Sequence, residues 1–557
     1  MKLNRLMALA VSFLMISVSA KSQDFLAAEQ VTDLSKKAAK DFPSNIIVDD
    51  QKQQIDLIYT TKAKSKKIKF DVLQFDYDLN LINEFSDEQE IENARNKYSW
   101  FGKKYRGEEY TVEQVTAEPN LTGKLVLKKQ SIRYYYSWFS GKYKTDVKNL
   151  DKLKFKAPSG RKLTYRGHYN HPETGELTVL GGEPDKFFIE RTYSLMKIDT
   201  DLNVVSEEKI DMMYPQAIIY NNLLDIGTDD ESIPKDWILV MAAAGGKGVK
   251  SKDADPNNRH YTYIRISPAG TVKERIDFDT KAHDWAVTGA VERDGAVYLY
   301  GAANAKGVED KYQTMYVYPQ KSYDAFQLVK ISGGKASFVS APTNDDIAKV
   351  NTKPKGQKKI SDYNGKKVQI RGISTGTGTG DVFITAQDFS TTQDATVFKD
   401  VYMFHFTKDG VLKRFYGLSP DQDKGGLAGK FNKNNDARTY PTNGSVIEGS
   451  GDKAFWLMEV VADIYTYKTQ DSNWNLDGSI TTTTTTYYIP RRNLQVATID
   501  TKDGALDDFT TLGGGEFFLY NETPFVSING GKQVVYLGWG GDKGRQLWMG
   551  KFDPATL

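Results

Sequence analysis

Short apolar segments separated by turn-forming residues run through most of the chain, and one five-residue pattern recurs among them. It consists of an apolar residue, any residue, a usually polar and often basic residue, an apolar residue, and then Asp, Ser or Thr. The seven copies are 72–76, 195–199, 263–267, 328–332, 403–407, 496–500 and 549–553. Turn formers follow six of them, since Asp and Asn bond to their own backbone and Gly accepts positive φ. Each copy therefore predicts a strand that ends in a turn.

A second, more continuously apolar segment precedes each copy. The set is 55–59, 177–180, 237–241, 297–300, 382–384, 455–458 and 534–537. Hairpin sequences such as Arg293-Asp294-Gly295 and Asn529-Gly530-Gly531 introduce several of these segments and indicate a further strand upstream. The repeating unit is therefore a four-stranded antiparallel meander whose middle strands are the most buried.

Repeated meanders of this kind are typical of β-propeller blades, which run to about 40–50 residues each. We expect an all-β fold, a propeller of seven or eight four-stranded blades over residues 44–557. Solenoid coils are shorter, and an array of sandwiches would not repeat one pattern so faithfully. The last unit stops at Leu557 after its third strand, so we expect the segment Ser44 to Asp49 to return as its fourth strand.

Three copies carry a glycine pair after the second strand, at Gly181-Gly182, Gly245-Gly246 and Gly540-Gly541, and the last continues into a strand that ends at Asp553. This resembles the kelch-type propeller repeat, with its double glycine and a strand ending in Asp. The copies lack the tryptophan that the kelch pattern places in its fourth strand. The resemblance implies a kelch-like propeller over most of residues 170–557.

The first twenty residues have the three parts of a secretory signal peptide. Lys2 and Arg5 precede an apolar run from Leu6 to Val18, and small residues end at Ala20. The run has 13 residues, short of the ~20 that a membrane-spanning helix needs, and we expect no membrane span. Residues 21–43 follow, in which apolar positions between Asp24 and Phe42 predict a short helix that packs on the ring or docks a partner.

Composition adds two constraints. The 557 residues include no cysteine, which excludes disulfides, thiolate metal sites and a cysteine nucleophile. The net charge of +2 is that of neither a generally basic nor a generally acidic chain. Together with the signal peptide, these features indicate an exported protein of Gram-negative bacterial type, in the periplasm or at the cell surface, that does not bind nucleic acid.

The charge is unequally distributed. An insertion at about 84–165 interrupts the repeats, and Lys97 to Arg166 holds seventeen basic and six acidic residues, a net of +11. It contains two similar aromatic stretches, from which we select candidate binding residues: Tyr98, Trp100, Phe101, Lys103, Tyr105, Arg133, Tyr136, Trp138, Phe139, Lys142 and Tyr143. Such a segment either packs within its own hairpins or a further blade, or binds an anionic partner, an envelope protein or an acidic glycan.

Three further segments have a predicted form. The run Thr481 to Thr486 favours strand because threonine is β-branched, and we expect it in an extended hairpin arm. The stretches Ser374 to Gly380 and Gly425 to Asn435 are expected loops.

Candidate catalytic chemistry is sparse. His168 and His171 have a spacing that could hold a metal, but no third ligand is fixed, and we expect neither metal nor cofactor. The loop carboxylates and amides Asp253, Asp255, Asn257 and Asn258 favour an ordinary loop over a calcium site. Four carboxylates near strand ends could converge at the central channel: Asp284, Asp388, Glu459 and Asp463.

Two hypotheses follow. The first is an exported β-propeller that acts as a binding or scaffolding protein, with the basic aromatic insertion and one propeller face as its partner surface. The alternative is a carbohydrate-active hydrolase or lyase that uses the four carboxylates at the channel. No nucleophile elbow, phosphate loop or zinc-protease helix is present, and the catalytic residues of such an enzyme are unknown.

Overall fold

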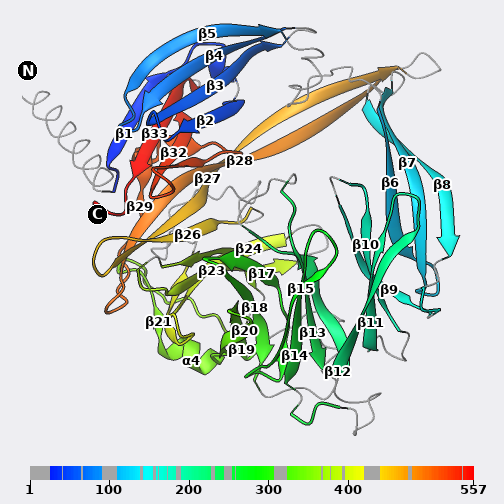
Figure 1. Ribbon diagram of the computed structural model, residues 1–557. Coiled ribbons are helices and arrows are strands. Elements are labelled where there is room, and N and C mark those ends of the chain that lie inside the picture. The colour runs from blue at the N-terminus through cyan, green and yellow to red at the C-terminus, as the bar shows by residue number, and fades with distance from the viewer. Residues whose placement is uncertain are drawn as a thin grey trace, which may run out of the picture.

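A computed structural model covers the chain. It describes residues 25–557 except for 41, 64–66, 91–109, 138–141, 155–157, 161, 172–173, 184–189, 227–232, 244–253, 258, 306–322, 366–367, 377, 392–395, 420–439, 475–479 and 542–543. The predicted signal peptide lies outside the described residues. The fold is all-β, and its mainly antiparallel sheets have the arrangement of a β-propeller (Figure 1).

The N-terminal half of the described chain forms three sheets. The first contains β2 (Asn45–Asp49), β3 (Gln54–Ala63), β4 (Lys67–Asp76) and β5 (Leu81–Glu90), and the second contains β6 (Tyr110–Pro119), β7 (Leu125–Ser137) and β8 (Lys142–Lys154). A seven-stranded sheet follows, with β9 (Thr164–Asn170), β10 (Leu177–Gly182), β11 (Glu190–Ile198), β12 (Val204–Leu223), β13 (Trp237–Ala243), β14 (His260–Ile266) and β15 (Val272–Asp279). The long strand β12 joins two four-stranded meanders, because its first half pairs with β11 and its second half with β13.

Four further sheets complete the described chain. They contain β16 (Asp284–Trp285), β17 (Gly289–Arg293), β18 (Ala296–Asn304), β19 (Ala325–Ser332) and β20 (Lys335–Ser340); then β21 (Asn351–Thr352), β22 (Val368–Thr375), β23 (Val382–Thr391), β24 (Thr396–Phe406) and β25 (Leu412–Leu418). The last two contain β26 (Asn443–Glu448), β27 (Lys453–Trp474), β28 (Ile480–Asp500) and β29 (Thr510–Thr511); then β30 (Phe517–Leu519), β31 (Phe525–Ile528), β32 (Gln533–Gly540), β33 (Gln546–Phe552) and, from the N-terminus, β1 (Ala28–Asp33). Short helices η1 (Ala38–Lys40), α4 (Asn344–Lys349) and η4 (Leu512–Gly515) lie between strands.

The recurring pattern is confirmed as a strand in all seven places, and the apolar segment upstream forms the neighbouring strand each time. Two of the turns after the pattern are alike in detail. Asp76 accepts hydrogen bonds from the backbone N–H groups of residues 78 and 80, and Asp199 does so from residues 201 and 203. In both turns the leucine between them has positive φ.

Neighbouring sheets pack face to face through apolar cores. Around the molecule the order is β2–β5, then β1 with β30–β33, then β26–β29, β21–β25, β16–β20, the two halves of the seven-stranded sheet, and β6–β8 (Figure 1). The alternation of the strands places residues such as Leu299, Phe404 and Trp456 in these cores with no exposed surface. The expected blade number of seven or eight stays a prediction.

The C-terminal sheet is completed by an N-terminal strand, but the predicted segment was wrong. Among the described strands, Asn45–Asp49 pairs with β3, and it is β1 that pairs with β33 along its whole length. Trp548 Nε1 donates to Glu29 Oε1 at 2.6 Å across this pair. The predicted helix over 24–42 was also wrong, because residues 28–33 form β1 and the helical part of the described segment is the short η1. An edge of β33 was available, and the backbone of residues 28–33 gains a ladder of hydrogen bonds there that a short helix would not have.

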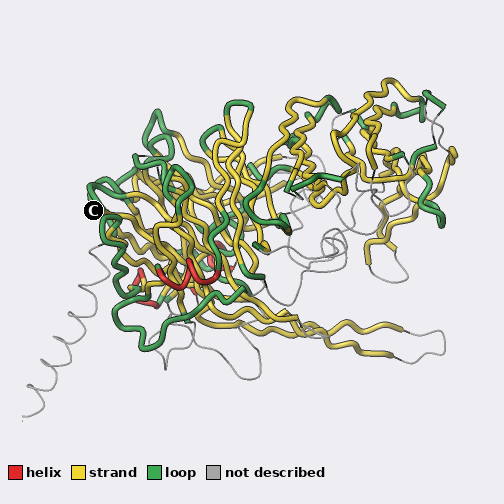
Figure 2. The backbone as a smooth tube through the Cα atoms, turned by 90° about the horizontal axis from the view of Figure 1, so that it is seen from below, coloured by secondary structure: helices red, strands yellow, loops and turns green. Residues whose placement is uncertain are grey.

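The predicted arm is confirmed. Strands β27 and β28 pair from Lys453 and Asp500 out to Trp474 and Ile480, whereas β26 covers only the first few residues of β27. We call residues 463–474 with 480–491 the arm. It runs about 40 Å at the rise of an antiparallel strand, and it projects away from the sheets (Figure 2). The threonine run pairs with residues 468–473, which fits the preference of β-branched residues for strands.

The predicted insertion has two parts. Residues 84–90 belong to β5 and complete the β2–β5 sheet, so they are not inserted. Residues 110–154 form the β6–β8 sheet, and Leu125 and Leu127 pack against Val179 and Met196 of the next sheet.

Among the described residues, no helix is long and apolar enough to cross a membrane.

Candidate functional site

Most of the predicted binding residues of the insertion lie outside the described residues. Those are Tyr98, Trp100, Phe101, Lys103, Tyr105, Trp138 and Phe139. The backbones of Tyr136 and Tyr143 are paired across β7 and β8, Lys142 begins β8, and Arg133 on β7 is exposed. The binding role of this set stays a prediction.

The four candidate carboxylates do not form one constellation in the described contacts. Asp284 lies in β16. The pKa of Tyr261 is raised by burial and then by the charge of this carboxylate. Asp388 lies in β23, where burial and then its charge raise the pKa of Tyr402. Asp284 and Asp388 are almost fully buried. Glu459 and Asp463 lie together on β27, at the point where the arm leaves its sheet.

In three of the seven copies, a contact between an acidic and a basic side chain explains the polar third position of the repeated pattern. In these copies the residue before the second strand of the meander is acidic, and it contacts a basic residue of the third strand. Lys197 Nζ lies 2.9 Å from Glu176 Oε2, Arg265 bonds Asp236, and His405 Nε2 lies 2.7 Å from Asp381 Oδ2. In each case, the residue that pairs with the base across the two strands lies two positions after the acid. This contact fastens the middle two strands of a sheet.

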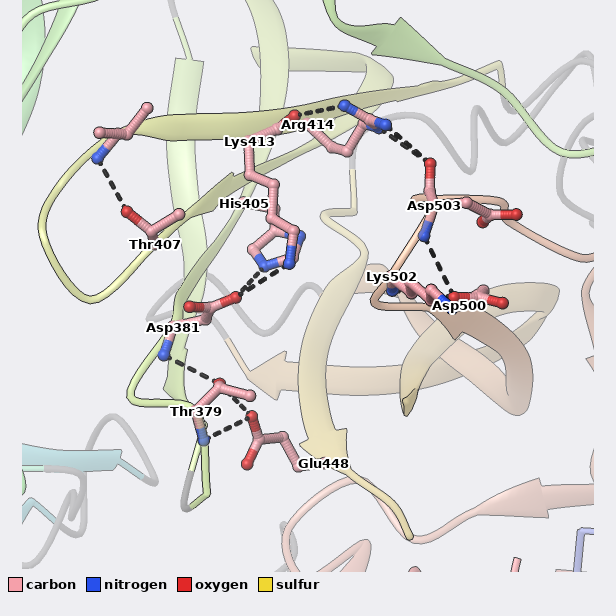
Figure 3. Close-up of polar contacts among 11 residues, drawn as sticks. Thr379, Asp381, His405, Thr407, Lys413, Arg414, Glu448, Asp500, Lys502 and Asp503 are labelled. Atoms are coloured by element: carbon pink, nitrogen blue, oxygen red, sulfur yellow. Dashed lines mark hydrogen bonds and ion pairs between the residues drawn. The ribbon is translucent and has the colours of Figure 1, made fainter. Parts of the chain in front are cut away.

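The His405 pair is the most buried of the three. Figure 3 shows His405 on β24 pointing at Asp381, with Lys413 of β25 beside them, and Phe383 stacks on the imidazole at 4.3 Å between ring centroids. Burial lowers the pKa of His405. Burial is the largest single influence on Asp381 and acts to raise its pKa, but the contacts with His405, the nearby Lys413 and the backbone N–H of Lys408 together outweigh burial and lower the pKa. A neutral imidazole that donates Nε2–H to a carboxylate satisfies both directions.

The same end of the β21–β25 sheet is tied to the β26–β29 sheet. Figure 3 shows Glu448 receiving hydrogen bonds from Thr379, and Arg414 donating to the Asp503 backbone oxygen, at 2.7 Å from Nη2. Glu448 also accepts from the Gly378 N–H at 2.6 Å. The contacts of Glu448 hold residues 378 and 379 of the predicted loop 374–380 against β26. We therefore assign these side chains a structural role.

At the other end of the same two sheets lies a half-buried cluster with an excess of positive charge. Arg371 on β22 donates to Asn443 Oδ1, and Asn443 Nδ2 donates to Glu459 Oε2 at 3.0 Å. Arg492 Nη2 contacts the Pro441 carbonyl at 3.5 Å. Burial and then the neighbouring Arg492 lower the pKa of Arg371, against the opposing effect of Glu459. We call Arg371, Asn443, Glu459 and Arg492 the arginine cluster.

Arg491 lies on the opposite face of β28, since neighbouring residues of a strand alternate. Its guanidinium is 4.8 Å from the ring centroids of Tyr465 and Trp539 and 5.3 Å from that of Phe518. Its Nη1 lies 3.3 Å from Asp463 Oδ2. The rings and the carboxylate hold the guanidinium, so Arg491 anchors the base of the arm to β30 and β32.

The histidines and the loop carboxylate that could have held a metal have protein contacts instead. His168 Nδ1 lies 2.6 Å from the Tyr165 hydroxyl, and His171 Nε2 lies 2.8 Å from the Thr178 hydroxyl. Asp255 accepts from three backbone N–H groups of its own loop. No group of three or more His, Asp or Glu residues in the described part of the chain is arranged to hold a metal ion.

Sequence reasoning missed the arginine cluster. Arg371 sits within an ordinary strand, and the Arg491-Arg492 pair follows the threonine run without a motif. The available signal was the position of two adjacent arginines at the expected base of a hairpin arm. Their partners on β22 and β26 are distant in sequence, and only the packing of neighbouring sheets reveals them.

Comparison with known proteins leaves the family open. No family model and no curated protein matches the chain. Solved structures to which it is similar include BBS1N in complex with ARL6DN, at 10% identity over 81% of this chain and 97% of that one, with a TM-score of 0.21. A lignostilbene dioxygenase of Pseudomonas brassicacearum has 11% identity over 80% and 89%, with a TM-score of 0.25. The native arabinanase Arb43A of Bacillus subtilis has 10% identity over 60% and 97%, with a TM-score of 0.20. These likenesses concern the fold alone.

Proposed function

We propose that this protein is an exported, kelch-like β-propeller of a Gram-negative bacterium that acts as a binding or scaffolding protein in the periplasm or at the cell surface. Export rests on the signal-peptide pattern of residues 1–20. The kelch likeness rests on the glycine pairs and on the strand that ends at Asp553.

The arm is the observation that carries the binding function. The fully buried residues of β27 that the structure describes end at Val460 and Val461, and beyond Glu459 the described strand that pairs with β27 is β28 alone. Tyr465, Tyr487 and Tyr488 are each between 44% and 46% exposed there. Exposed tyrosines on a projecting hairpin suit a contact surface, because each ring offers an apolar face and a polar hydroxyl.

The basic region supports an anionic partner. The net charge of +11 between Lys97 and Arg166 attracts such a partner over a distance of about a Debye length, ~8–10 Å at physiological salt. An envelope protein or an acidic glycan has the required charge. The exposed strand β8 presents Lys148 and Lys152 on this region.

The alternative, a carbohydrate-active hydrolase or lyase, needs two carboxyl groups in different environments at a fixed separation. Glu459 is held by Asn443, and Asp463 is paired with Arg491. These contacts favour structural roles for both carboxylates, and we prefer binding to catalysis.

Incubation of the purified protein with acidic polysaccharides separates the two functions. Size-exclusion chromatography should show the protein co-eluting with an intact polymer, whereas progressive shortening of the polymer would overturn the binding proposal. A pull-down from envelope extract, analysed for proteins and sugars, should lose its partner when Lys148 and Lys152 are replaced by Glu. The matched control replaces two exposed lysines elsewhere, Lys335 of β20 and Lys532 of the turn before β32, in the same way.

A further inference from the structure

We propose that Arg371 and Arg492 bind the carboxylate group of an acidic sugar. The proposal rests on the proposed function, and it names the ligand class of one site beside the arm.

The two guanidinium groups are short of acceptors. Arg371 donates to the Asn443 side-chain amide, and Arg492 contacts the Pro441 carbonyl, and both of these acceptors are neutral. Neither arginine forms an ion pair with a described residue, and the Nε atoms of both are shielded from solvent without a hydrogen-bond partner. A guanidinium has five N–H donors, so most donors of the pair have no acceptor among the described residues.

The charges at the site do not balance. Arg371 and Arg492 repel each other, and the carboxylate that acts on Arg371 is that of Glu459, which already accepts a hydrogen bond from Asn443. Two cations therefore face one anion in a half-buried place, where charge interactions are screened less than at the surface. An added oxyanion would relieve the repulsion and take up the free donors.

The geometry of the donors suits a carboxylate. The planar guanidinium fork matches the two oxygens of a carboxylate. Because both arginines are half-buried, a pendant group on a flexible chain reaches them more readily than the broad surface of a folded protein does.

An exposed ring beside the arginines favours a sugar. Tyr488 and Arg492 are four residues apart on β28, so they project from the same face of the strand about 13 Å apart. Tyr488 is 46% exposed, and the hydroxyl of Tyr440 donates to its backbone carbonyl at 3.2 Å. A short acidic oligosaccharide spans this distance with a carboxylate on the arginines and a ring against Tyr488.

Isothermal titration calorimetry on the full chain without residues 1–20 tests the proposal with four probes: a tetragalacturonate, its neutral galactose counterpart, a tetraglutamate peptide and inorganic phosphate. We expect the tetragalacturonate to bind at least about tenfold more tightly than the others. Arg371→Gln and Arg492→Gln should each weaken it at least about tenfold. Arg371→Lys keeps the charge but loses the fork, and it should weaken binding as well. Arg414→Gln, at the far end of the same two sheets, should leave the affinity unchanged.

Equal affinity for the peptide or for phosphate would overturn the assignment to an acidic sugar. Loss of affinity in Arg414→Gln equal to that in Arg371→Gln would overturn the assignment to this site. The proposed function fails separately: if no envelope component is retained by the wild-type protein, binding itself is wrong, whereas retention by both arginine variants would overturn the arginine site alone.

Discussion

The imidazole of His405 occupies the place beside Asp381 that a lysine or an arginine occupies in two other meanders. Its Nε2 atom lies 2.7 Å from Asp381 Oδ2, and the side chain of His405 has no exposed surface. Lys197 and Arg265 carry a permanent charge in the corresponding contacts with Glu176 and Asp236. This sheet therefore has a version of the shared contact that responds to pH near neutrality.

His405 should make the folded state less stable in mild acid. Burial lowers its pKa in the folded protein, so the unfolded chain takes up a proton at higher pH than the folded one does. Stability from this residue is complete above the unfolded pKa of about 6.5 and falls as the pH drops below it. The measurement is the melting temperature of wild type and His405→Gln from pH 7.5 to 5.5, and we expect the advantage of the wild type to shrink as the pH falls.

The difference between the two proteins is the informative quantity, because other histidines titrate in the same range. Burial also lowers the pKa of His168 and of His171. Burial acts to lower the pKa of His260 too, but Asp277 and other carboxylates together outweigh burial and raise it. A constant difference in melting temperature across the range would contradict a buried neutral His405.

Strand β1 should contribute to global stability. The N–H of Leu34 donates to the carbonyl of Arg545 opposite it. In an antiparallel pair the N–H groups of successive residues alternate between facing the partner strand and facing away. The N–H of Gln30 therefore faces β33, and the N–H of Val31 faces away from it. Gln30→Pro removes one ladder bond and should cost about 1–3 kcal/mol. Val31→Pro is the matched control. Chemical denaturation should show the larger loss for Gln30→Pro, and equal losses would mean that β1 does not clasp the ring.

Arg491 should hold the base of the arm in place. Arg491→Ala removes the cation from between Tyr465, Trp539 and Phe518, where such contacts contribute about 0.5–2 kcal/mol each. Hydrogen exchange at residues 463–467 and 487–491 should become faster. Lys468→Ala, an exposed change farther out on the arm, should leave exchange at the base unaltered, and no difference between the two variants would refute the anchoring role.

The repeated strands were predictable because their signal is local. Each copy of the pattern carries its own alternation and its own turn, as at Asp76 and Asp199, where the side chain bonds its own backbone. The threonine arm was predictable for the same reason. The N-terminal strand was not, because residues 28–33 become a strand only when the edge of β33, more than five hundred residues away, lies beside them.

The site was less predictable than the fold. Asn443 and Glu459 are partners across one hairpin, but Arg371 joins them from a different sheet. No spacing in the sequence indicates that contact. The aromatic residues of the insertion were conspicuous in the sequence, yet their binding role still rests on composition and charge.

Binding through the arm is the central claim, and co-sedimentation with isolated cell envelopes tests it most directly. In the trimmed variant, Asn-Gly replaces residues 466–488 and joins the cross-strand partners Tyr465 and Ile489 by a two-residue turn. Val411→Glu, an exposed change at the opposite end of a neighbouring sheet, serves as the control. We predict that wild type and Val411→Glu sediment with the envelopes and that the trimmed protein stays in the supernatant. Equal sedimentation of all three proteins, or of none, would contradict the account.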